Sequence, residues 1–412
     1  MKLLSHRFLP AAFCLSFPII SLLIVAAVAQ DIAPPIPQKL VVHSNVLNED
    51  RVVWVRTPHG YELGKDALPV LYLTDGPSEI NEIGSIIDFL VNNGRMPPLI
   101  VVGIANTDRT RDLTPTRGSD RDSSGKETPP VGGGGDRFVD FIQTELMPEI
   151  EQRYRTAAYK IFAGHSFGGL MAIHILTTRP DMFQAYIAAS PSLWWDHQRT
   201  LHQAQDFFAA HEELNKTLFF SLGGEGPDMQ DGFDKLKATL TAKAPKDFRW
   251  KSEQFPEEDH GSTVLRAHYA GLRMVFADWP MPRDKDGTPI GGMAGIEQHY
   301  RDLSRRYGYP IPVPENVING FGYRLLGDNK FDEAIAVFKH NVELYPGSAN
   351  VYDSLGEGYE NAGKLDLAKE NFQKAIEIAT KTSDPSLNSF NGHLNRVTDK
   401  AKAAGAKTAE QK

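Results

Sequence analysis

The chain has 412 residues, of which 41% are hydrophobic and 23% are charged, and its formal net charge is −8 at pH 7. These values are typical of a globular protein with two domains, and the negative charge argues against a protein that binds nucleic acid through a basic face. The single cysteine, Cys14, lies in an N-terminal apolar segment, so we expect no disulfide and no thiolate metal site in the mature chain.

Residues 1–29 have the order of a secretory signal peptide. Lys2 and Arg7 precede an apolar run, and Ala27-Val28-Ala29 supplies the small residues of a cleavage site. The alternative is an uncleaved anchor, because residues 8–28 are nearly long enough to span a bilayer. We expect cleavage, which predicts an exported protein, periplasmic or secreted, with no membrane attachment after the signal is removed.

Residues 38–280 alternate between strand and helix patterns. Continuous apolar runs predict buried strands, and helical spacing of apolar residues follows several of them. The expected strands lie within residues 51–58, 68–76, 97–106, 157–166, 182–192, 216–226 and 248–260, and the clearest helices within 136–154 and 168–180. This alternation predicts an α/β fold in which a mostly parallel sheet is flanked by helices.

Two stretches interrupt this pattern. Residues 106–135 are rich in Gly, Pro, Ser and charged residues, which indicates a long loop that is functional or disordered. Residues 281–295 read as an interdomain linker.

A repeat of 34 residues follows, over residues 296–380. Gly322, Ala334 and Phe338 recur as Gly356, Ala368 and Phe372, and the pattern resembles the tetratricopeptide repeat. Two repeats are too few to stand alone, so we expect them to pack on a helix at 295–308 or on the first domain. Residues 381–412 are predicted to form a terminal helix and a flexible tail.

The stretch Gly164-His165-Ser166-Phe167-Gly168 has the pattern of a nucleophile elbow. An apolar run enters it and a helical pattern leaves it, which is the strand–turn–helix frame that the elbow requires. We therefore predict that Ser166 is a catalytic nucleophile and that the Phe167 N–H stabilises an oxyanion. The alternative is a glycine-rich turn with an incidental serine.

A serine nucleophile needs a base and an acid, which follow it along the chain in this fold class. His260 lies in the loop after the last predicted strand, where the base belongs; the alternative is an ordinary surface histidine. The loop after the preceding strand offers Glu225, Asp228 and Asp231 as the acid. We favour Glu225 over Asp228 because it comes earliest in that loop.

The remaining predictions concern the oxyanion hole and the substrate pocket. Pro77 has no N–H, so the second oxyanion donor is Gly76 or Ser78, and we prefer Gly76. Trp194 or Trp195 is a candidate wall of the pocket, although tryptophans packed under the loop are an equal alternative. Four arginines could attract an anionic ligand, but aspartates interleave with them and favour a solvated loop. Those arginines are Arg109, Arg111, Arg117 and Arg121, and Arg111 is our candidate pocket residue.

The motifs YLTDG, RTRDLTP, GHSFGG, SPSLWW, GGEG and DHGS, in this order, resemble the α/β-hydrolase esterases related to ferric-enterobactin esterases and to esterase D. The resemblance covers about residues 38 to 280. It implies hydrolysis of carboxylic esters by a serine nucleophile, with no metal or organic cofactor. Siderophore-type or small acyl esters are the substrates it suggests.

Two other functions remain open. An acyltransferase would use the same acyl-enzyme with an alcohol in place of water. A repeat-bearing binding protein would keep the hydrolase domain as a scaffold only. The helical repeats also suggest a protein partner or self-association, beside the small-molecule ester.

Overall fold

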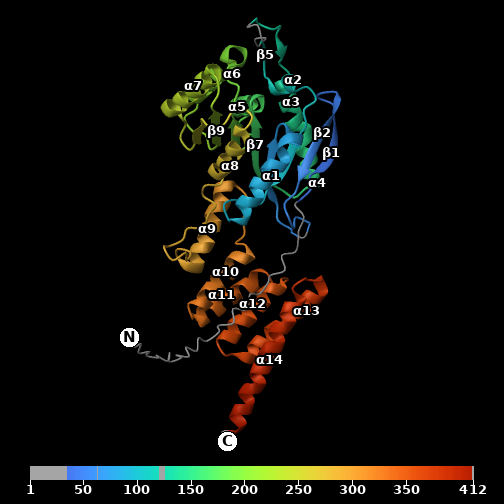
Figure 1. Ribbon diagram of the computed structural model, residues 1–412, viewed down its shortest axis with the longest axis vertical. Coiled ribbons are helices and arrows are strands. Elements are labelled where there is room, and N and C mark those ends of the chain that lie inside the picture. Colours follow the sequence, from blue (N-terminus) through green and yellow to red (C-terminus); the bar gives the residue numbers. More distant parts are fainter. Residues whose placement is uncertain (1–34, 63, 120–125, 411–412) are drawn as a thin grey trace, which may run out of the picture. The chain divides into compact units, whose positions relative to one another are not determined.

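The computed structural model describes residues 35–62, 64–119 and 126–410, so the predicted signal peptide and Arg121 lie outside the described residues. The described chain contains an eight-stranded sheet with the order β1-β2-β4-β3-β7-β8-β9-β10 (Figure 1). Only the β1–β2 and β2–β4 pairs are antiparallel, and the other pairs are parallel. The strands are β1 (Gln38–Ser44), β2 (Glu49–Arg56), β3 (Leu68–Leu73), β4 (Ile100–Ile104), β7 (Thr156–His165), β8 (Ala185–Ala189), β9 (Thr217–Gly223) and β10 (Arg249–Phe255). The mostly parallel α/β fold predicted from the sequence is confirmed.

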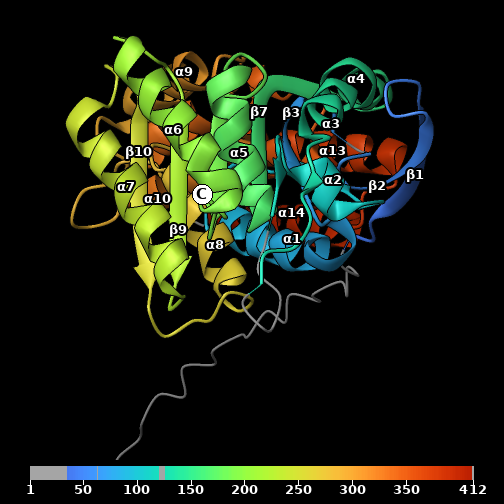
Figure 2. The ribbon, with the colours of Figure 1, turned by 90° about the horizontal axis from the view of Figure 1, so that it is seen from above.

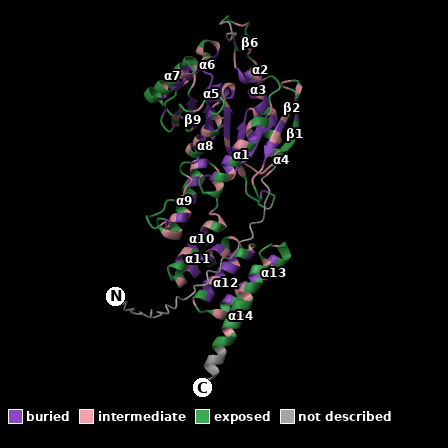
Figure 3. Ribbon diagram, viewed as in Figure 1, coloured by how far each residue is buried: buried purple, intermediate pink, exposed green. Residues whose placement is uncertain are grey.

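Helices cover both faces of the sheet, as parallel strands with crossover connections require. In β3, Val70 and Tyr72 belong to one hydrophobic cluster, whereas Leu71 and Leu73 belong to another, because successive side chains point to opposite faces. Figure 2 shows α5 (Phe167–Thr178) and α6 (Trp195–Ala210) on one face, with α1 (Gly76–Asn92) and α8 (Thr263–Val275) on the other. The central strands are buried on both faces (Figure 3).

The helix predicted over residues 136–154 is built from three segments. These are α3 (Gly135–Phe141), a π-helical turn (Ile142–Leu146) and α4 (Met147–Arg153). Pro148 lies in the first turn of α4. A proline has no N–H and cannot continue the regular hydrogen-bond ladder, which explains the change of helix type here.

The polar stretch 106–135 is partly regular. It contains the short helix α2 (Arg109–Leu113) and an antiparallel ribbon of β5 (Arg117–Gly118) and β6 (Val131–Gly132). Asp108 begins α2, because its side chain accepts a hydrogen bond from the Arg111 N–H at 3.0 Å. The first part of this stretch is held against the sheet domain, because Asp112 of α2 pairs with the buried Arg51 of β2 at 2.6 Å.

A helical region follows the sheet. Its helices are α9 (Gly292–Tyr307), α10 (Glu315–Gly327), α11 (Phe331–Leu344), α12 (Ala349–Asn361), α13 (Leu365–Thr382) and α14 (Leu387–Glu410). The two repeats have the same packing: a Cβ on Gly322 would lie 2.4 Å from the Phe338 ring, and one on Gly356 would lie 2.6 Å from the Phe372 ring. Helix α14, the last of these, has 24 residues and lies within the stretch predicted to hold a terminal helix and a tail.

Helix α9 packs against the sheet domain. Its last residue, Tyr307, has its ring 5.1 Å from that of Tyr159 in β7 and 5.4 Å from that of Phe276, which follows α8. The same hydrophobic cluster continues into α10 and α11 through Ile318 and Phe338. No helix in the described part of the chain is long and apolar enough to cross a membrane.

Candidate active site

Ser166 lies on a sharp turn between β7 and α5. Its φ is 60° and its ψ is −113°, a conformation that non-glycine residues rarely adopt and that marks functional turns. The two flanking glycines make the turn possible. A Cβ on Gly164 would lie 2.6 Å from the backbone of Gly168, and one on Gly168 would lie 2.2 Å from the Thr74 hydroxyl. The turn therefore requires glycine at positions 164 and 168, because a side chain at either position would collide with neighbouring atoms.

His260 and Glu225 are brought together from two neighbouring loops. Glu225 follows β9, His260 follows β10, and their Oε2 and Nδ1 atoms lie 2.6 Å apart. The loops are joined by the Gly224 N–H, which donates to the Glu258 carbonyl at 2.6 Å. Asp259 fixes the turn at His260, because its Oδ1 accepts from the Gly261 and Ser262 N–H groups at 2.9 and 2.7 Å.

The Glu225 side chain is 4% exposed, and each of its oxygens has a partner. Oε2 faces His260, while Oε1 accepts from the Ser190 hydroxyl and from the Gly223 N–H at 3.0 Å. Burial alone would raise the pKa of Glu225, but these hydrogen bonds from His260, Ser190 and Gly223 outweigh it and hold the pKa below its usual value. Glu225 is therefore a carboxylate at neutral pH.

The other candidate acids lie elsewhere. Asp231 pairs with Lys235 at 2.6 Å on the exposed face of α7 (Pro227–Lys243). Asp228, in the first turn of α7, lines a neighbouring cavity of about 640 Å³. Of the three carboxylates considered, the structure brings only Glu225 into contact with His260.

A cavity of about 380 Å³ joins these groups. Its lining residues are Ser166, Phe167, Ser192, Trp194, Gly224, Glu225, Gly226, Met229 and His260. The Ser166 hydroxyl lies 3.2 Å from that of Ser192, and among the described residues it makes no hydrogen bond to His260. The contact between the Ser166 hydroxyl and His260 must therefore form before His260 can take the proton, and such contacts often tighten only with substrate bound.

Some of the predicted pocket residues lie outside this cavity. Trp195 is 2% exposed and its Nε1–H donates to the Thr116 carbonyl at 3.0 Å, so it packs under the β5–β6 ribbon while Trp194 faces the cavity. The guanidinium of Arg111 is held by Glu49 and Asp112, each with a contact of 2.7 Å. Arg111 therefore pairs with these two carboxylates and does not line the cavity beside Ser166. Gly76 is buried at the start of α1 and does not line the cavity.

Sequence reasoning did not single out several residues around the triad candidates. The Ser190 hydroxyl donates a hydrogen bond to Glu225, and the Ser190 backbone is left-handed, with a φ of 41°. The ring of His165 lies 4.6 Å from that of His260. Burial, with the nearby His260 and Arg109, lowers the pKa of His165 to about 4, so it is neutral beside His260 at neutral pH. Ser190 follows a strand as many serines do, so nothing in the sequence indicated that its hydroxyl would contact Glu225.

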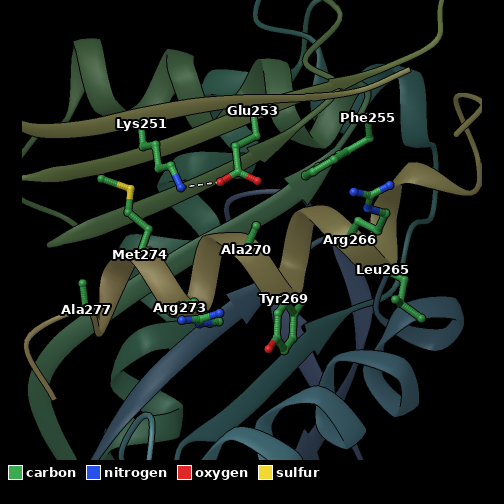
Figure 4. Close-up of a pocket in the computed structure, with 10 residues that line it drawn as sticks. All are labelled: Lys251, Glu253, Phe255, Leu265, Arg266, Tyr269, Ala270, Arg273, Met274 and Ala277. Atoms are coloured by element: carbon green, nitrogen blue, oxygen red, sulfur yellow. Dashed lines mark hydrogen bonds and ion pairs between the residues drawn. The ribbon is translucent and has the colours of Figure 1, made fainter. Parts of the chain in front are cut away.

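A second groove, of about 570 Å³, lies between β10 and α8 (Figure 4). The side chains of Lys251, Glu253 and Phe255 line it from the strand, and those of Tyr269, Arg273 and Met274 line it from the helix. Lys251 and Glu253, two residues apart on β10, pair with each other. None of the predicted site residues lines this groove, and the described residues contain no cluster of three or more His, Cys, Asp or Glu side chains suited to a metal ion.

The chain is similar in sequence to known esterases. A family model described as "Putative esterase" matches residues 44–263, more than half of the chain. Ferri-bacillibactin esterase BesA of Bacillus subtilis is 32% identical over 220 residues, which cover 48% of this chain and 74% of that protein. The siderophore triacetylfusarinine C esterase of Aspergillus fumigatus is 32% identical over 180 residues, which cover 37% of this chain but only 61% of that protein.

The fold is also similar to that of solved structures. An IroE-like serine hydrolase from Shewanella oneidensis is 30% identical, with a TM-score of 0.63 over 71% of this chain and 95% of its own. An uncharacterised protein from Capnocytophaga ochracea, at 16% identity, has a TM-score of 0.59 over 88% of this chain and shows the fold alone. The chain belongs to this esterase family and is a serine hydrolase related to the siderophore esterases.

Proposed function

We propose that the chain hydrolyses carboxylic esters of the siderophore or small acyl type through Ser166, His260 and Glu225. One observation carries this proposal: the His260–Glu225 pair, with its 2.6 Å contact, lines the same cavity as Ser166. A buried carboxylate on Nδ1 fixes the histidine tautomer that leaves Nε2 free to accept a proton.

The reaction follows from these positions. Ser166 Oγ attacks the ester carbonyl carbon as His260 Nε2 takes the hydroxyl proton, and Glu225 stabilises the imidazolium that forms. The tetrahedral intermediate collapses, the C–O bond to the alcohol breaks, and His260 gives its proton to the leaving alkoxide. Water then attacks the acyl-enzyme by the same sequence and releases the acid and free Ser166.

The oxyanion donors we propose are the N–H groups of Phe167 and Gly76. Phe167 is the first residue of α5, where a backbone N–H has no partner within the helix. The alternative donor, Ser78, is in use, because its N–H donates to the Asp75 carbonyl at 3.1 Å. Gly76 is therefore the better second donor.

A substrate panel tests this function. We expect the purified chain to release p-nitrophenol from short acyl esters and to open a ferric siderophore ester, with both activities lost in Ser166→Ala. Adding a competing alcohol reports on acyl transfer: an ester of that alcohol among the products would favour the acyltransferase alternative. No hydrolysis of any ester by the wild-type chain would contradict the proposal.

Export and the role of the repeats are also proposals. We propose that residues 1–29 direct the chain to the periplasm or the outside of the cell, on the basis of their charge and apolar pattern. We also propose that the α10–α13 pairs form tetratricopeptide-like repeats that bind a protein partner or a second copy. Cell fractionation with and without residues 1–29 tests the first proposal, and retention of the activity in the cytoplasm with the full chain would contradict it.

A further inference from the structure

The loop that leads to Gly76 is held in an unusual conformation. Asp75 has a φ of 55° and precedes α1, yet its side chain makes no capping hydrogen bond to that helix. Its carboxylate instead accepts hydrogen bonds from Asn106 and Arg109. A left-handed non-glycine residue persists only where its surroundings hold it, so these contacts fix the loop.

Arg109 makes a two-point contact with this loop and a further contact with the nucleophile turn. Its Nε and Nη2 donate to Asp75 Oδ1 and Oδ2 at 2.8 and 3.0 Å, and Nη2 also donates to the His165 carbonyl at 3.1 Å. Its Cζ lies 5.7 Å from the centre of the Phe167 ring. One guanidinium therefore joins the residue before Gly76 to the residue before the nucleophile.

The other side of the loop is held by backbone contact. A Cβ on Gly76 would lie 2.3 Å from the carbonyl carbon of Gly103, so the loop rests directly on β4. Gly76 thus has a rigid strand on one side, while the Asp75–Arg109 pair ties the loop to the turn on the other.

The contacts of Arg109 also indicate what it does not do. The edge of the guanidinium formed by Nε and Nη2 is occupied by Asp75 and by the His165 carbonyl. A side chain that bound an anionic substrate would have this edge free. The Arg109 and Asp75 side chains are also largely buried, with exposures of 34% and 12%, which favours a structural contact over a ligand site.

We propose that Arg109 is a positioning residue, which sets the separation of the Phe167 and Gly76 N–H groups by bridging Asp75 and the His165 carbonyl. The proposal rests on the proposed function, because it concerns the oxyanion hole of that reaction. A planar guanidinium that contacts a carboxylate at two points and a carbonyl at a third cannot be replaced by the single ammonium of lysine.

The test compares Arg109→Ala and Arg109→Lys with a matched arginine. Arg56 pairs with Asp88, near the far end of the same helix α1, at 2.5 Å, and serves as the control. We expect kcat per active site, titrated by exhaustive fluorophosphonate labelling, to fall about 100-fold in Arg109→Ala with KM within about threefold of wild type. Arg109→Lys should recover little of this loss, and Arg56→Ala should keep its kcat per titrated site.

Two further readouts separate positioning from general stability. Affinity for a trifluoromethyl ketone, which forms an oxyanion on Ser166, should fall by the same factor as kcat/KM. Added methylguanidinium should restore part of the activity of Arg109→Ala and none in Arg56→Ala. The inference is overturned if kcat per titrated site stays within about threefold of wild type, or if only KM for anionic esters rises. A wild-type chain that neither labels nor hydrolyses esters would instead remove the proposed function itself.

Discussion

Glycines lie at close contacts both in the nucleophile turn and in the C-terminal helices, but they make different things possible there. At the turn, Gly164 and Gly168 approach backbone and hydroxyl atoms so closely that Ser166 is held in a strained conformation. In the helices, Gly322 and Gly356 approach the flat rings of buried phenylalanines. The strained turn costs stability but positions a reactive group, whereas the glycines in the helices serve only close packing.

Substitutions in the two regions should therefore have different effects. Changes at the sheet's loops should reduce activity more than stability. Changes in the helical region should reduce stability and leave activity per folded molecule intact. Ser166→Ala and Glu225→Gln test the first expectation, and Gly322→Ala tests the second.

Ser166→Ala should produce the largest effect. We expect ester hydrolysis to fall by at least about 10⁴-fold, because removal of a triad nucleophile leaves only the contribution of the oxyanion hole and of binding. The melting temperature should stay within a few degrees of wild type, because the substitution removes one hydroxyl group whose hydrogen-bond partner is the Ser192 hydroxyl. Residual activity near the wild-type level would show that another group is the nucleophile.

Glu225→Gln should reduce kcat by about 10³-fold while the fold is retained, since the amide cannot stabilise the imidazolium and permits the wrong tautomer. The control is Asp231→Asn, in the same loop-and-helix segment, where the carboxylate pairs with Lys235 on the surface. Steady-state kinetics on one short ester compares the two. Equal losses in both variants would argue that the segment, and not the Glu225–His260 contact, is what matters.

Gly322→Ala should destabilise the helical region. The new methyl group would lie 2.4 Å from the ring of the buried Phe338, and such overpacking costs about 1–3 kcal/mol. A Cβ on Gly320, two residues earlier in α10, would meet no atom within 4 Å, so Gly320→Ala should be neutral or stabilise by about 0.5–1 kcal/mol. Thermal unfolding measures both, and kcat per titrated site should be unchanged in each.

His165→Gln should change how stability depends on pH. The pKa of His165 is about 4 in the fold against an ordinary value of 6.5, so the unfolded chain binds a proton in that window and the native state does not. Stability should therefore fall as pH drops from 6.5 to 4, by about 2 kcal/mol from this group after allowance for partial exposure. Urea unfolding across this range should show a shallower fall in the variant, and parallel curves would contradict the assignment.

The sequence predicted most of what positions the site. The apolar runs and the strand–turn–helix frame around Ser166 define the parallel sheet, and position in the loop was enough to favour Glu225, the carboxylate that contacts His260. These features are local along the chain. The residues whose placement was not predicted depend on contacts between loops that are far apart in sequence.

Arg109, Arg111 and Trp195 illustrate the difference. Nothing in the alternation of arginine and aspartate in residues 108–112 shows that Arg109 turns toward Asp75 while Arg111 turns toward Glu49. Two adjacent tryptophans likewise carry no sign of which one faces the cavity. Trp195 is directed inward because the Thr116 carbonyl accepts its N–H and Gly118 leaves room for its ring.

The most direct test of the triad is covalent labelling with a fluorophosphonate followed by intact-mass analysis and peptide mapping. We predict one adduct per chain on Ser166, no adduct in Ser166→Ala, and labelling slowed by at least about 10³-fold in His260→Ala. An adduct on another residue, or equal labelling rates in the wild type and His260→Ala, would contradict the assignment of Ser166 and His260 as nucleophile and base.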